Sequence, residues 1–488
     1  MVPEAGPARW DLAVIGAGPA GMTAAVAAAG SGARVIVLDL AGRPGGQYWR
    51  WGPATADGRF HHGWAAFTAL RARFTAHQEA GQIGYRPGHA VFHLDPPAAP
   101  GGWFRVHAVA DDRRRDYAAA DARAVIVATG AYDRQLPVPG WTLPGVMAAG
   151  AAQALLKDSA VPAGRRVAVA GAGPFLLPVA AGLARAGARV VAVIEAGQPL
   201  HYLRRPAGLA ASWGKLPEAA GYLAELARRR VPVLRRHAVI AAHGGTRLES
   251  VTVARIDAGW EIVPGRQRTL QVDVLAAGYG FIPQVELLAE AGARLVPAAG
   301  PGAFAAETDA GQQTTVPGLF AAGETAGVGG ADLARIEGAA AGRAAARYAG
   351  YLAAPPGAAV RRARAALGRF AAVMESVHAV QPGWTRWPAD DTIICRCEEV
   401  TLGQLRTAIG LGADDARSAK LLARPGMGWC QGRMCGHAVA GLVAAAAGAG
   451  GAGEPGRAGP EAFGSRPLAQ PVPLRVLAEL ARADAEPG

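Results

Sequence analysis

A glycine-rich turn near the start of the chain constrains its fold most strongly. An apolar stretch, residues 11–15, precedes the turn, and a small-residue stretch, residues 20–29, follows it. Between them, Gly16, Gly18 and Gly21 form a G-x-G-x-x-G pattern. The first glycine permits a tight turn, the second lets the backbone approach a pyrophosphate, and the third lets helix and strand pack closely. The order strand, glycine turn, helix therefore predicts a dinucleotide-binding unit with the phosphates at the helix N-terminus.

An acidic residue completes this unit. The stretch 34–38 is β-branched and predicts a second strand, and Asp39 follows it directly. A carboxylate at this place accepts hydrogen bonds from ribose hydroxyls. A bare glycine pattern is weak evidence, but a strand, a helix and an acidic residue in the required order make it strong. The bound ligand is FAD or NAD on this evidence alone.

Strand–helix alternation recurs over residues 166–195, which predicts an α/β chain with parallel sheets. We expect two dinucleotide-binding, Rossmann-like domains, the second inserted into the first, and a small helical C-terminal module. Residues 474–483 predict a short helix near the end of the chain. The expected divisions are 1–160 and 281–350 for the two parts of the first domain, 161–280 for the second domain, 351–390 for a connector, 391–447 for the module, and 448–488 for a flexible linker and tail.

The second glycine turn departs from the pattern at one position. Gly171 and Gly173 match, and Glu195 stands in the acidic position, but Leu176 replaces the third glycine. A leucine there obstructs close packing of helix and strand or the approach of a pyrophosphate. We expect a retained fold with lost or altered nucleotide binding; a differently placed nucleotide such as ATP is the alternative.

All cysteines of the chain fall within one 41-residue window. They form a C-x-C pair and a C-x4-C pair, at Cys395, Cys397, Cys430 and Cys435. Four thiolates hold either a zinc ion or an iron–sulfur cluster, so their number does not decide between them. The spacing differs from that of most zinc sites, in which both pairs enclose two to four residues.

The surrounding residues fit a site for negatively charged sulfur. Thr401 and Gln404 predict a capping box that opens a helix just after the first pair. Residues 426–429 predict a tight loop before the second pair, and Gly436 opens an alanine-rich helix after it. Loop amides and a helix N-terminus near the sulfurs stabilise their charge.

Composition limits the class of protein. With 488 residues, 51% hydrophobic and 18% charged, the chain is long enough for several globular domains. The net charge of +12 does not indicate nucleic-acid binding, because the basic residues are scattered rather than gathered on one stretch. An acidic partner subunit is the alternative explanation. No apolar run is long enough to span a membrane and no leader is evident, so we expect a cytoplasmic protein, with peripheral membrane association as the alternative.

Three segments resemble the two-dinucleotide-domain flavoprotein superfamily. They are Arg43-Pro44-Gly45-Gly46-Gln47, Val127-Ala128-Thr129-Gly130 and Phe320-Ala321-Ala322-Gly323-Glu324. The resemblance implies FAD at the first site. The residues implied to line it are Gly16, Gly18, Pro19, Gly21, Asp39, Arg43, Gly46, Gln47, Thr129, Gly130, Gly323 and Glu324. The superfamily has aspartate where this chain has Glu324, and the extra methylene shifts the expected contact.

Nearly the whole chain is similar to the large α subunit of bacterial heteromeric flavin dehydrogenases, the family of the opine oxidase A subunit, hydrogen cyanide synthase and D-hydroxyproline dehydrogenase. The segments that carry this resemblance are 139–146, 173–177, 426–428, 430–435 and 466–467. It implies a module like bacterioferritin-associated ferredoxin, with the four cysteines as ligands of a 2Fe-2S cluster. It also implies an FAD-dependent β subunit, a small ferredoxin-like subunit, a downstream electron acceptor, and a second nucleotide or flavin at a subunit interface.

The resulting expectation is an oxidoreductase acting on CH–NH or CH–NH2 donors. This chain would be the electron-transfer subunit of an enzyme that oxidises an amino acid, imino acid or opine-like secondary amine. One alternative is a self-contained NAD(P)H-dependent FAD reductase with a fused 2Fe-2S module; another is an assembly subunit with structural cofactors. No catalytic residue is assigned: His61 and His62 follow the flavin loop, but adjacent histidines are more often surface or core polar residues.

Overall fold

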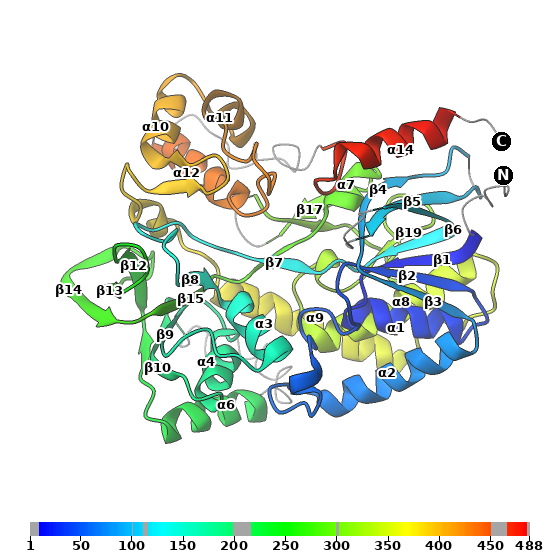
Figure 1. Ribbon diagram of the computed structural model, residues 1–488, viewed down its shortest axis with the longest axis horizontal. Helices are drawn as coiled ribbons and strands as arrows, with labels where there is room; N and C mark the ends of the chain where they lie inside the picture. Colours follow the sequence, from blue (N-terminus) through cyan, green and yellow to red (C-terminus); the bar gives the residue numbers. More distant parts are fainter. Residues whose placement is uncertain are drawn as a thin grey trace.

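The structure, a computed structural model, describes residues 9–99, 101–110, 116–198, 216–298, 302–449 and 466–485. The first sheet has seven strands in the order β3-β2-β1-β6-β5-β4, with β19 also beside β6 (Figure 1). Its strands are β1 (Arg9–Ile15), β2 (Val35–Asp39), β3 (Ile83–Pro87), β4 (His89–Asp95), β5 (Phe104–Ala110), β6 (Tyr117–Val127) and β19 (Leu319–Ala321). Five of them run parallel, and β4 and β5 form an antiparallel extension.

Strand β6 lets the chain return to this sheet after the second domain. Its first half pairs with β5 and its second half pairs with β19, although β19 follows only after the whole second domain in the sequence. The carboxyl ends of β1, β2, β6 and β19 therefore meet at one edge, which is where open parallel sheets bind ligands.

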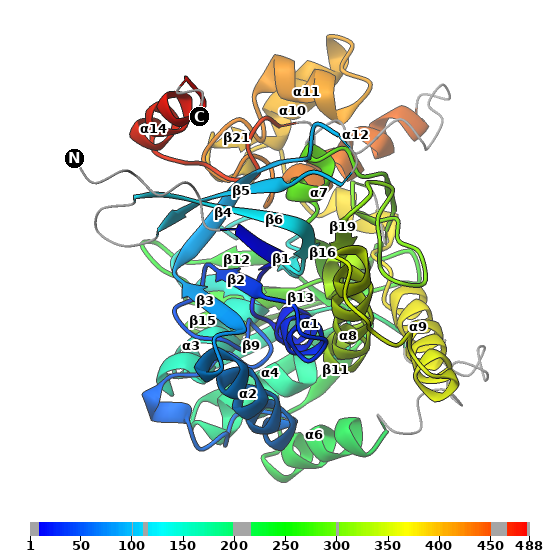
Figure 2. The ribbon, with the colours of Figure 1, turned by 90° about the vertical axis from the view of Figure 1, so that its right-hand side faces the viewer.

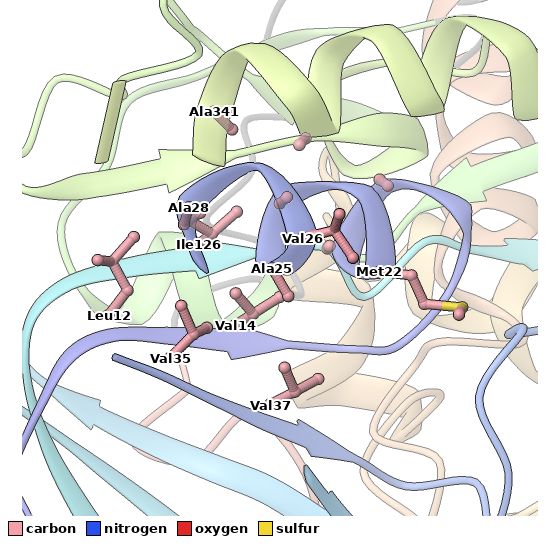
Figure 3. Packing of buried hydrophobic residues seen from close by; sticks show 14 of the residues in the cluster. Leu12, Val14, Met22, Ala25, Val26, Ala28, Val35, Val37, Ile126 and Ala341 are labelled. Carbon is pink, nitrogen blue, oxygen red and sulfur yellow. The ribbon is translucent and has the colours of Figure 1, made fainter. Parts of the chain in front are cut away.

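Small residues let two helices pack tightly on one face of the sheet. The helices are α1 (Pro19–Ala29) and α8 (Gly330–Tyr348), with α2 (Trp64–Glu79) beside them. Figure 3 shows Val14 and Ile126 of the sheet beneath α1, and Ala341 of α8 on the other side of α1. A Cβ atom on Gly342 would lie 2.2 Å from the carbonyl oxygen of Ala24, so α8 approaches α1 at backbone distance.

The second sheet has five parallel strands in the order β11-β10-β9-β15-β8. They are β8 (Val146–Ala148), β9 (Arg166–Gly171), β10 (Arg189–Glu195), β11 (Val233–Arg235) and β15 (Val274–Gly278). One face packs on the helices α3 (Ala149–Ser159), α4 (Leu176–Arg185) and α6 (Leu216–Arg228). The other face packs on an antiparallel meander of β12 (His237–His243), β13 (Ser250–Ile256) and β14 (Ile262–Gln271). The predicted α/β class with two Rossmann-like units is confirmed.

Two crossing strands connect the sheets (Figure 1). They are β7 (Ala131–Asp133), which leaves the first sheet, and β16 (Phe281–Pro283), which returns to it, and they pair antiparallel. After β16 come α7 (Glu286–Glu290), β17 (Leu295–Pro297), β18 (Phe304–Ala306) and the 3-10 turn η4 (Gly323–Ala326).

The cysteine module sits at one end of the molecule (Figures 1 and 2). The connector contributes α9 (Ala358–Val377) and the 3-10 turn η5 (Pro382–Arg386), and the module contains β20 (Ile393–Cys395), β21 (Val400–Thr401), α10 (Leu402–Gly410), α11 (Ala416–Ala423) and α12 (Gly436–Ala449). The predicted capping box is present, since Thr401 Oγ1 accepts from the amide of Gln404 and the Gln404 side chain accepts from the amide of Thr401.

The end of the chain returns to the first sheet. Helix α14 (Leu474–Ala485) contains the predicted helix and buries Val476 against Phe92 and Val109 of β4 and β5. Most of the expected flexible linker, residues 450–465, lies outside the described residues. Within the described part of the chain, no helix combines the length and apolar character needed to cross a membrane.

Candidate functional site

The first glycine turn has the geometry that its sequence predicts. Gly16 has φ +99°, and a Cβ there would lie 2.5 Å from the carbonyl oxygen of Ala128. A Cβ on Gly21 would lie 1.8 Å from the carbonyl oxygen of Gly16, so neither position tolerates a side chain. Gly18 differs, because the atom nearest to its Cβ position is 3.8 Å away, on Gly46. The open side of the turn is therefore at Gly18, where the pattern brings a pyrophosphate. Pro19 is the first residue of α1, at a position where its fixed φ suits the helix start.

The predicted flavin loop crosses this turn. Gly46 has φ +61°, and its Cβ position lies 2.7 Å from the Cα atom of Gly18. Next to it, Gln47 accepts a hydrogen bond from Arg50 Nε at 3.1 Å. The guanidinium of Arg43 stacks on the Trp51 ring at 5.5 Å from its centroid. The loop is thus held directly over the glycine turn.

Asp39 lies at the end of β2, where the sequence places it. Its carboxyl group is buried and interacts with the backbone amides of Ala41 and Ala17 and with the hydroxyl of Tyr85, at 3.5 Å. Burial raises the pKa of Asp39 to about 6, although these hydrogen bonds act in the opposite direction. A ribose hydroxyl would supply a further hydrogen bond to this carboxylate.

The turns after β6 and β19 are tied to each other. Gly130 donates its amide to Thr325 Oγ1 at 3.1 Å, and Thr129 Oγ1 donates to the carbonyl oxygen of Gln284 at 3.1 Å. Gly323, with φ +74°, donates its amide to Glu337 Oε2 at 3.3 Å. The predicted FAD-lining residues of these two turns therefore lie on one continuous edge.

Glu324 has an acidic neighbour that sequence reasoning missed. Burial raises the pKa of Glu324 to about 7, and the nearby charge of Asp133 acts in the same direction. Burial likewise raises the pKa of Asp133, which accepts a hydrogen bond from the amide of Gly150 at 3.2 Å. The two carboxyl groups come from segments 191 residues apart in sequence, so no local signal could have paired them.

The histidine pair is engaged by the protein itself. His61 Nε2 donates to the carbonyl oxygen of Arg50 at 2.5 Å, and its ring packs on Trp64. His62 Nε2 lies 3.4 Å from Glu218 Oε2. These contacts agree with a polar structural role.

Lys157 is a second residue that the sequence did not single out. It is buried on α3, and its Nζ donates to the carbonyl oxygen of Tyr48 at 2.7 Å, just after the flavin loop. Burial lowers the pKa of Lys157 from 10.5 to about 7. A single lysine in a short helix carries no sequence signal for this contact between the two domains.

The second glycine turn is closed by the residue expected to bind ribose. The carboxylate of Glu195 accepts from the amide of Gly173 at 3.2 Å and from the amide of Gly197 at 2.8 Å. His378, at the end of α9, places its Nδ1 3.6 Å from Glu195 Oε1. Helix α4 begins at Leu176, five residues after Gly171, whereas α1 begins three residues after Gly16. Leu176 itself is buried in the core of the second sheet, so the later helix start accommodates the missing glycine.

The connector and the module cover this turn. Ala172 and Ala196, on either side of the turn, belong to one hydrophobic core with Trp260, Trp384 and Trp387. Trp260 and Trp387 stack at 5.8 Å between centroids, and Trp387 Nε1 donates to the carbonyl oxygen of Trp260 at 3.0 Å. Beside the turn itself, the His378 ring lies 3.9 Å from the Cβ position of Gly173 and 2.9 Å from that of Gly197.

The four cysteines converge from both ends of the module. Cys395 and Cys435 are buried, Cys430 is half-buried and Cys397 is exposed. The thiol of Cys435 hydrogen-bonds to Cys395 and to Cys430, and Cys397 contacts Cys430. The amide of Gly426 donates to Cys395 Sγ at 3.4 Å.

The chemistry of these thiols fits an iron–sulfur cluster. The hydrogen bond from Cys435, assisted by backbone amides, lowers the pKa of Cys395 to about 6 and that of Cys430 to about 5, whereas the pKa of Cys435 is raised. Four thiols that contact one another fit a group that takes four thiolates, either a zinc ion or a 2Fe-2S cluster.

The segment that follows the flavin turn runs beneath the module. His437 Nε2 donates to the carbonyl oxygen of Gln135 at 2.6 Å, and Trp141 Nε1 donates to the carbonyl oxygen of Ile393 at 2.6 Å. Nearby, Arg433 Nε lies 3.1 Å from Glu286 Oε1. The edge that carries Thr129 and Gly130 is thus joined to the cysteine module through residues 135–141 and through α7.

Comparison with known proteins agrees with both sites. Residues 10–346 match the family of pyridine nucleotide-disulphide oxidoreductases, and residues 393–445 match the BFD-like 2Fe-2S binding domain. The chain is 34% identical to the opine oxidase A subunit of Agrobacterium tumefaciens, over 97% of this chain and 91% of that protein. It is 32% identical to the hydrogen cyanide synthase subunit HcnB of Pseudomonas aeruginosa, over 86% of this chain and 90% of that protein.

A solved structure shows the same fold. The L-proline dehydrogenase structure from P. horikoshii superposes with a TM-score of 0.63 at 21% identity, covering 91% of this chain and 76% of that chain.

Fold, glycine turn and cysteine module together define an FAD-dependent oxidoreductase that also carries a 2Fe-2S cluster. More narrowly, the chain belongs to the pyridine nucleotide-disulphide oxidoreductase family and to the group within it that contains the opine oxidase A subunit and the hydrogen cyanide synthase subunit HcnB. The resemblance stated from the sequence is confirmed.

Proposed function

We propose that this chain is the electron-transfer subunit of a heteromeric dehydrogenase that oxidises an amino acid, an imino acid or an opine-like secondary amine. The closed second glycine turn carries the proposal, because a self-contained reductase needs that turn for nicotinamide. With Glu195 bonded to the amide of Gly173 and the His378 ring beside it, this turn would not hold a nicotinamide dinucleotide, and electrons would enter from another protein. The relatives support this reading, since the opine oxidase A subunit, HcnB and the sarcosine oxidase alpha subunit of Rhizobium meliloti are all named as subunits.

Residues of this chain would hold both FAD and the 2Fe-2S cluster. The open backbone at Gly18 would face the pyrophosphate of FAD, and Asp39 would accept the ribose hydroxyls. The remaining FAD-lining residues would be those named from the sequence on the edge formed by β6 and β19. The four cysteines would hold the 2Fe-2S cluster, with the Gly426 amide donating to Cys395. When bound, FAD would supply two-electron chemistry and the cluster would supply one-electron transfer.

The protein must also shield the electron-transfer path between FAD and the cluster from water. Cys395 and Cys435 are buried, and the indole of Trp141 closes the module against the segment after β7. Two of the four cysteines are therefore shielded from water. A dry environment limits the loss of electrons to side reactions and tunes the potential of an iron–sulfur cluster.

Partners and location follow as part of the same proposal. The substrate would be oxidised on an FAD-dependent β subunit, and a small ferredoxin-like subunit, an electron acceptor and a second nucleotide or flavin at a subunit interface would complete the enzyme. Thiolates that serve as metal ligands fit a reducing compartment, which favours the cytoplasm. We also propose that the chain divides into domains at the boundaries expected from the sequence, except that β8 and α3 belong with the second sheet, so that the first boundary lies before Val146 instead of at residue 160.

Reconstitution with the partner tests this function. The chain is coexpressed with the products of neighbouring genes, and the purified complex is mixed anaerobically with amino acids, imino acids and opines. We expect one substrate class to bleach the flavin and to produce the EPR signal of a reduced 2Fe-2S cluster. In a complex carrying Cys397→Ser, we expect flavin bleaching without that signal. Full activity of the isolated chain with an amine, as a homo-oligomer, would contradict the proposal.

A further inference from the structure

The stretch between the flavin loop and α2 rests on a helix of the second sheet. Figure 1 shows this stretch beside α3, and its 3-10 turn η1 (Pro53–Thr55) contacts that helix. The buried Thr55 donates its hydroxyl to the carbonyl oxygen of Lys157 at 2.5 Å. A Cβ atom on Gly52 would lie 2.0 Å from the carbonyl oxygen of Asp158, so the two main chains approach at backbone distance. The first domain is thus fixed to the last turn of α3.

Lys157 adds a side-chain contact from α3 to the end of the flavin loop. Its Nζ donates to the carbonyl oxygen of Tyr48 at 2.7 Å and lies 5.3 Å from the centre of the Tyr48 ring. Tyr48 directly follows Gln47, the last residue of the loop. The lysine is only 5% exposed, so this hydrogen bond is shielded from water.

The contact continues through the loop to the first glycine turn. The residue after Tyr48, Trp49, is buried and donates its amide to the carbonyl oxygen of Gly45 at 3.1 Å. The Cβ position of Gly46 lies 2.7 Å from the Cα atom of Gly18. A displacement of the Tyr48 carbonyl would therefore move backbone that lies against the open side of the turn.

Packing alone does not explain a lysine at this place. Burying an amine costs free energy that must be offset by a hydrogen bond, whereas a methionine of similar length would fill the same space without that cost. What the amine adds to α3 is the hydrogen bond to the Tyr48 carbonyl. The contact joins the second sheet, whose own glycine turn is closed by Glu195, to the loop over the first turn.

We propose that Lys157 is a positioning residue for FAD. Through the Tyr48 carbonyl, the second domain holds the flavin loop in the conformation that binds FAD at the first glycine turn. The inference rests on FAD at that turn, as in the proposed function, but it requires no partner subunit. It gives the second domain a task that its closed glycine turn does not serve.

The rate at which the purified full-length holoprotein releases FAD tests this role. Released FAD is followed by its fluorescence after dilution of the parent and of each variant. Lys157→Met keeps the apolar length and removes the donor, and should accelerate the release of FAD by about tenfold or more, as expected for one lost buried hydrogen bond. Lys157→Gln keeps an N–H donor on a slightly shorter side chain, and should give an intermediate rate.

The adjacent residue of α3 supplies the matched control. Leu156 is buried and faces α4, with its Cδ2 atom 3.1 Å from the Cβ position of Gly182. Leu156→Ala should lower the free energy of unfolding by about 2–5 kcal/mol while leaving the contact with Tyr48 intact. We expect it to release FAD like the parent, and urea unfolding of each variant records the change in stability separately.

Three results would overturn the proposal. They are an unchanged release of FAD in Lys157→Met, an equal acceleration in Leu156→Ala, and a rate in Lys157→Gln no slower than in Lys157→Met. The second result would mean that FAD binding follows the stability of the second domain rather than the hydrogen bond to the loop. Because the measurement uses the isolated chain without turnover, none of these results bears on how electrons enter the protein. Conversely, reduction of the flavin by NADH would contradict the proposed function and leave the role of Lys157 standing.

Discussion

The carboxylate of Glu195 accepts the backbone amide of Gly173 at 3.2 Å, so the second glycine turn is closed by its own acidic residue. In the first turn, Asp39 interacts instead with Ala17, one position before the second glycine. The longer side chain of glutamate thus reaches the amide that would face a pyrophosphate. Because of this contact, we expect the first turn to bind a dinucleotide and the second turn not to bind one.

Replacing Glu195 with alanine should destabilise the second domain without creating a nicotinamide site. The change leaves the amides of Gly173 and Gly197 without their acceptor, which costs about 1–3 kcal/mol for each buried group. Urea unfolding measures the loss, and Glu249→Ala, an exposed glutamate of the same domain, is the control. Because the His378 ring still lies beside the turn, NADH should not bind; a saturable NADH titration of the variant would show that Glu195 alone closes the site.

Gly21→Ala should abolish FAD binding. The new methyl group would lie 1.8 Å from the carbonyl oxygen of Gly16, so α1 must move away from the turn. Gly42→Ala is the matched control, because nothing lies within 4 Å of its Cβ position. Flavin absorbance per protein should be near zero in the first variant and unchanged in the second. Full flavin content in Gly21→Ala would refute the assignment of this turn.

Gly428→Ala should disrupt the cluster although it changes no cysteine. Its methyl group would lie 2.4 Å from the Cβ atom of Cys397, which must shift relative to Cys430. Gly410→Ala, at the end of α10 with open space around its Cβ position, should leave the cluster intact. Iron content and the EPR signal after dithionite reduction distinguish the two, while flavin content should be equal. An undiminished cluster in Gly428→Ala would argue against Cys397 as a ligand.

Lys157→Met should remove a pH-dependent cost to stability. Burial lowers the pKa of Lys157 from 10.5 to about 7, so the unfolded chain binds more protons between these pH values. The contribution of Lys157 to the free energy of unfolding therefore falls as the pH drops from 10.5 towards 7. Relative to Lys157→Met, the parent should gain about 2 kcal/mol of unfolding free energy between about pH 7 and pH 9. Urea unfolding of both proteins at the two pH values measures this difference. Equal changes in unfolding free energy in the parent and in the variant would contradict a neutral buried lysine.

Local sequence signals predicted the parts of the fold that depend on neighbouring residues. The glycine turn at Gly16, the cap at Thr401 and the helix over 474–483 all follow from patterns within a few residues. The departure at Leu176 also drew attention to the second turn. The sequence did not predict how that turn accommodates leucine, because the later start of α4 depends on packing in the second sheet.

Contacts between residues that lie far apart in the chain could not be predicted from the sequence. Trp260 and Trp387 stack across 127 residues, and Asp133 meets Glu324 only because β6 and β19 end at the same edge. Each residue by itself has the appearance of ordinary core or surface. One chain without an alignment offers no pairing signal for them, so the closure of the second turn emerged only from the fold.

The central claim is that electrons do not enter this chain from a nicotinamide. Anaerobic addition of NADH to the purified holoprotein, followed by visible absorbance and low-temperature EPR, tests it most directly. We predict that NADH leaves the flavin oxidised and the EPR spectrum silent, whereas dithionite then reduces both groups. Flavin bleaching by NADH together with the signal of a reduced 2Fe-2S cluster would contradict the account and identify the chain as a self-contained reductase.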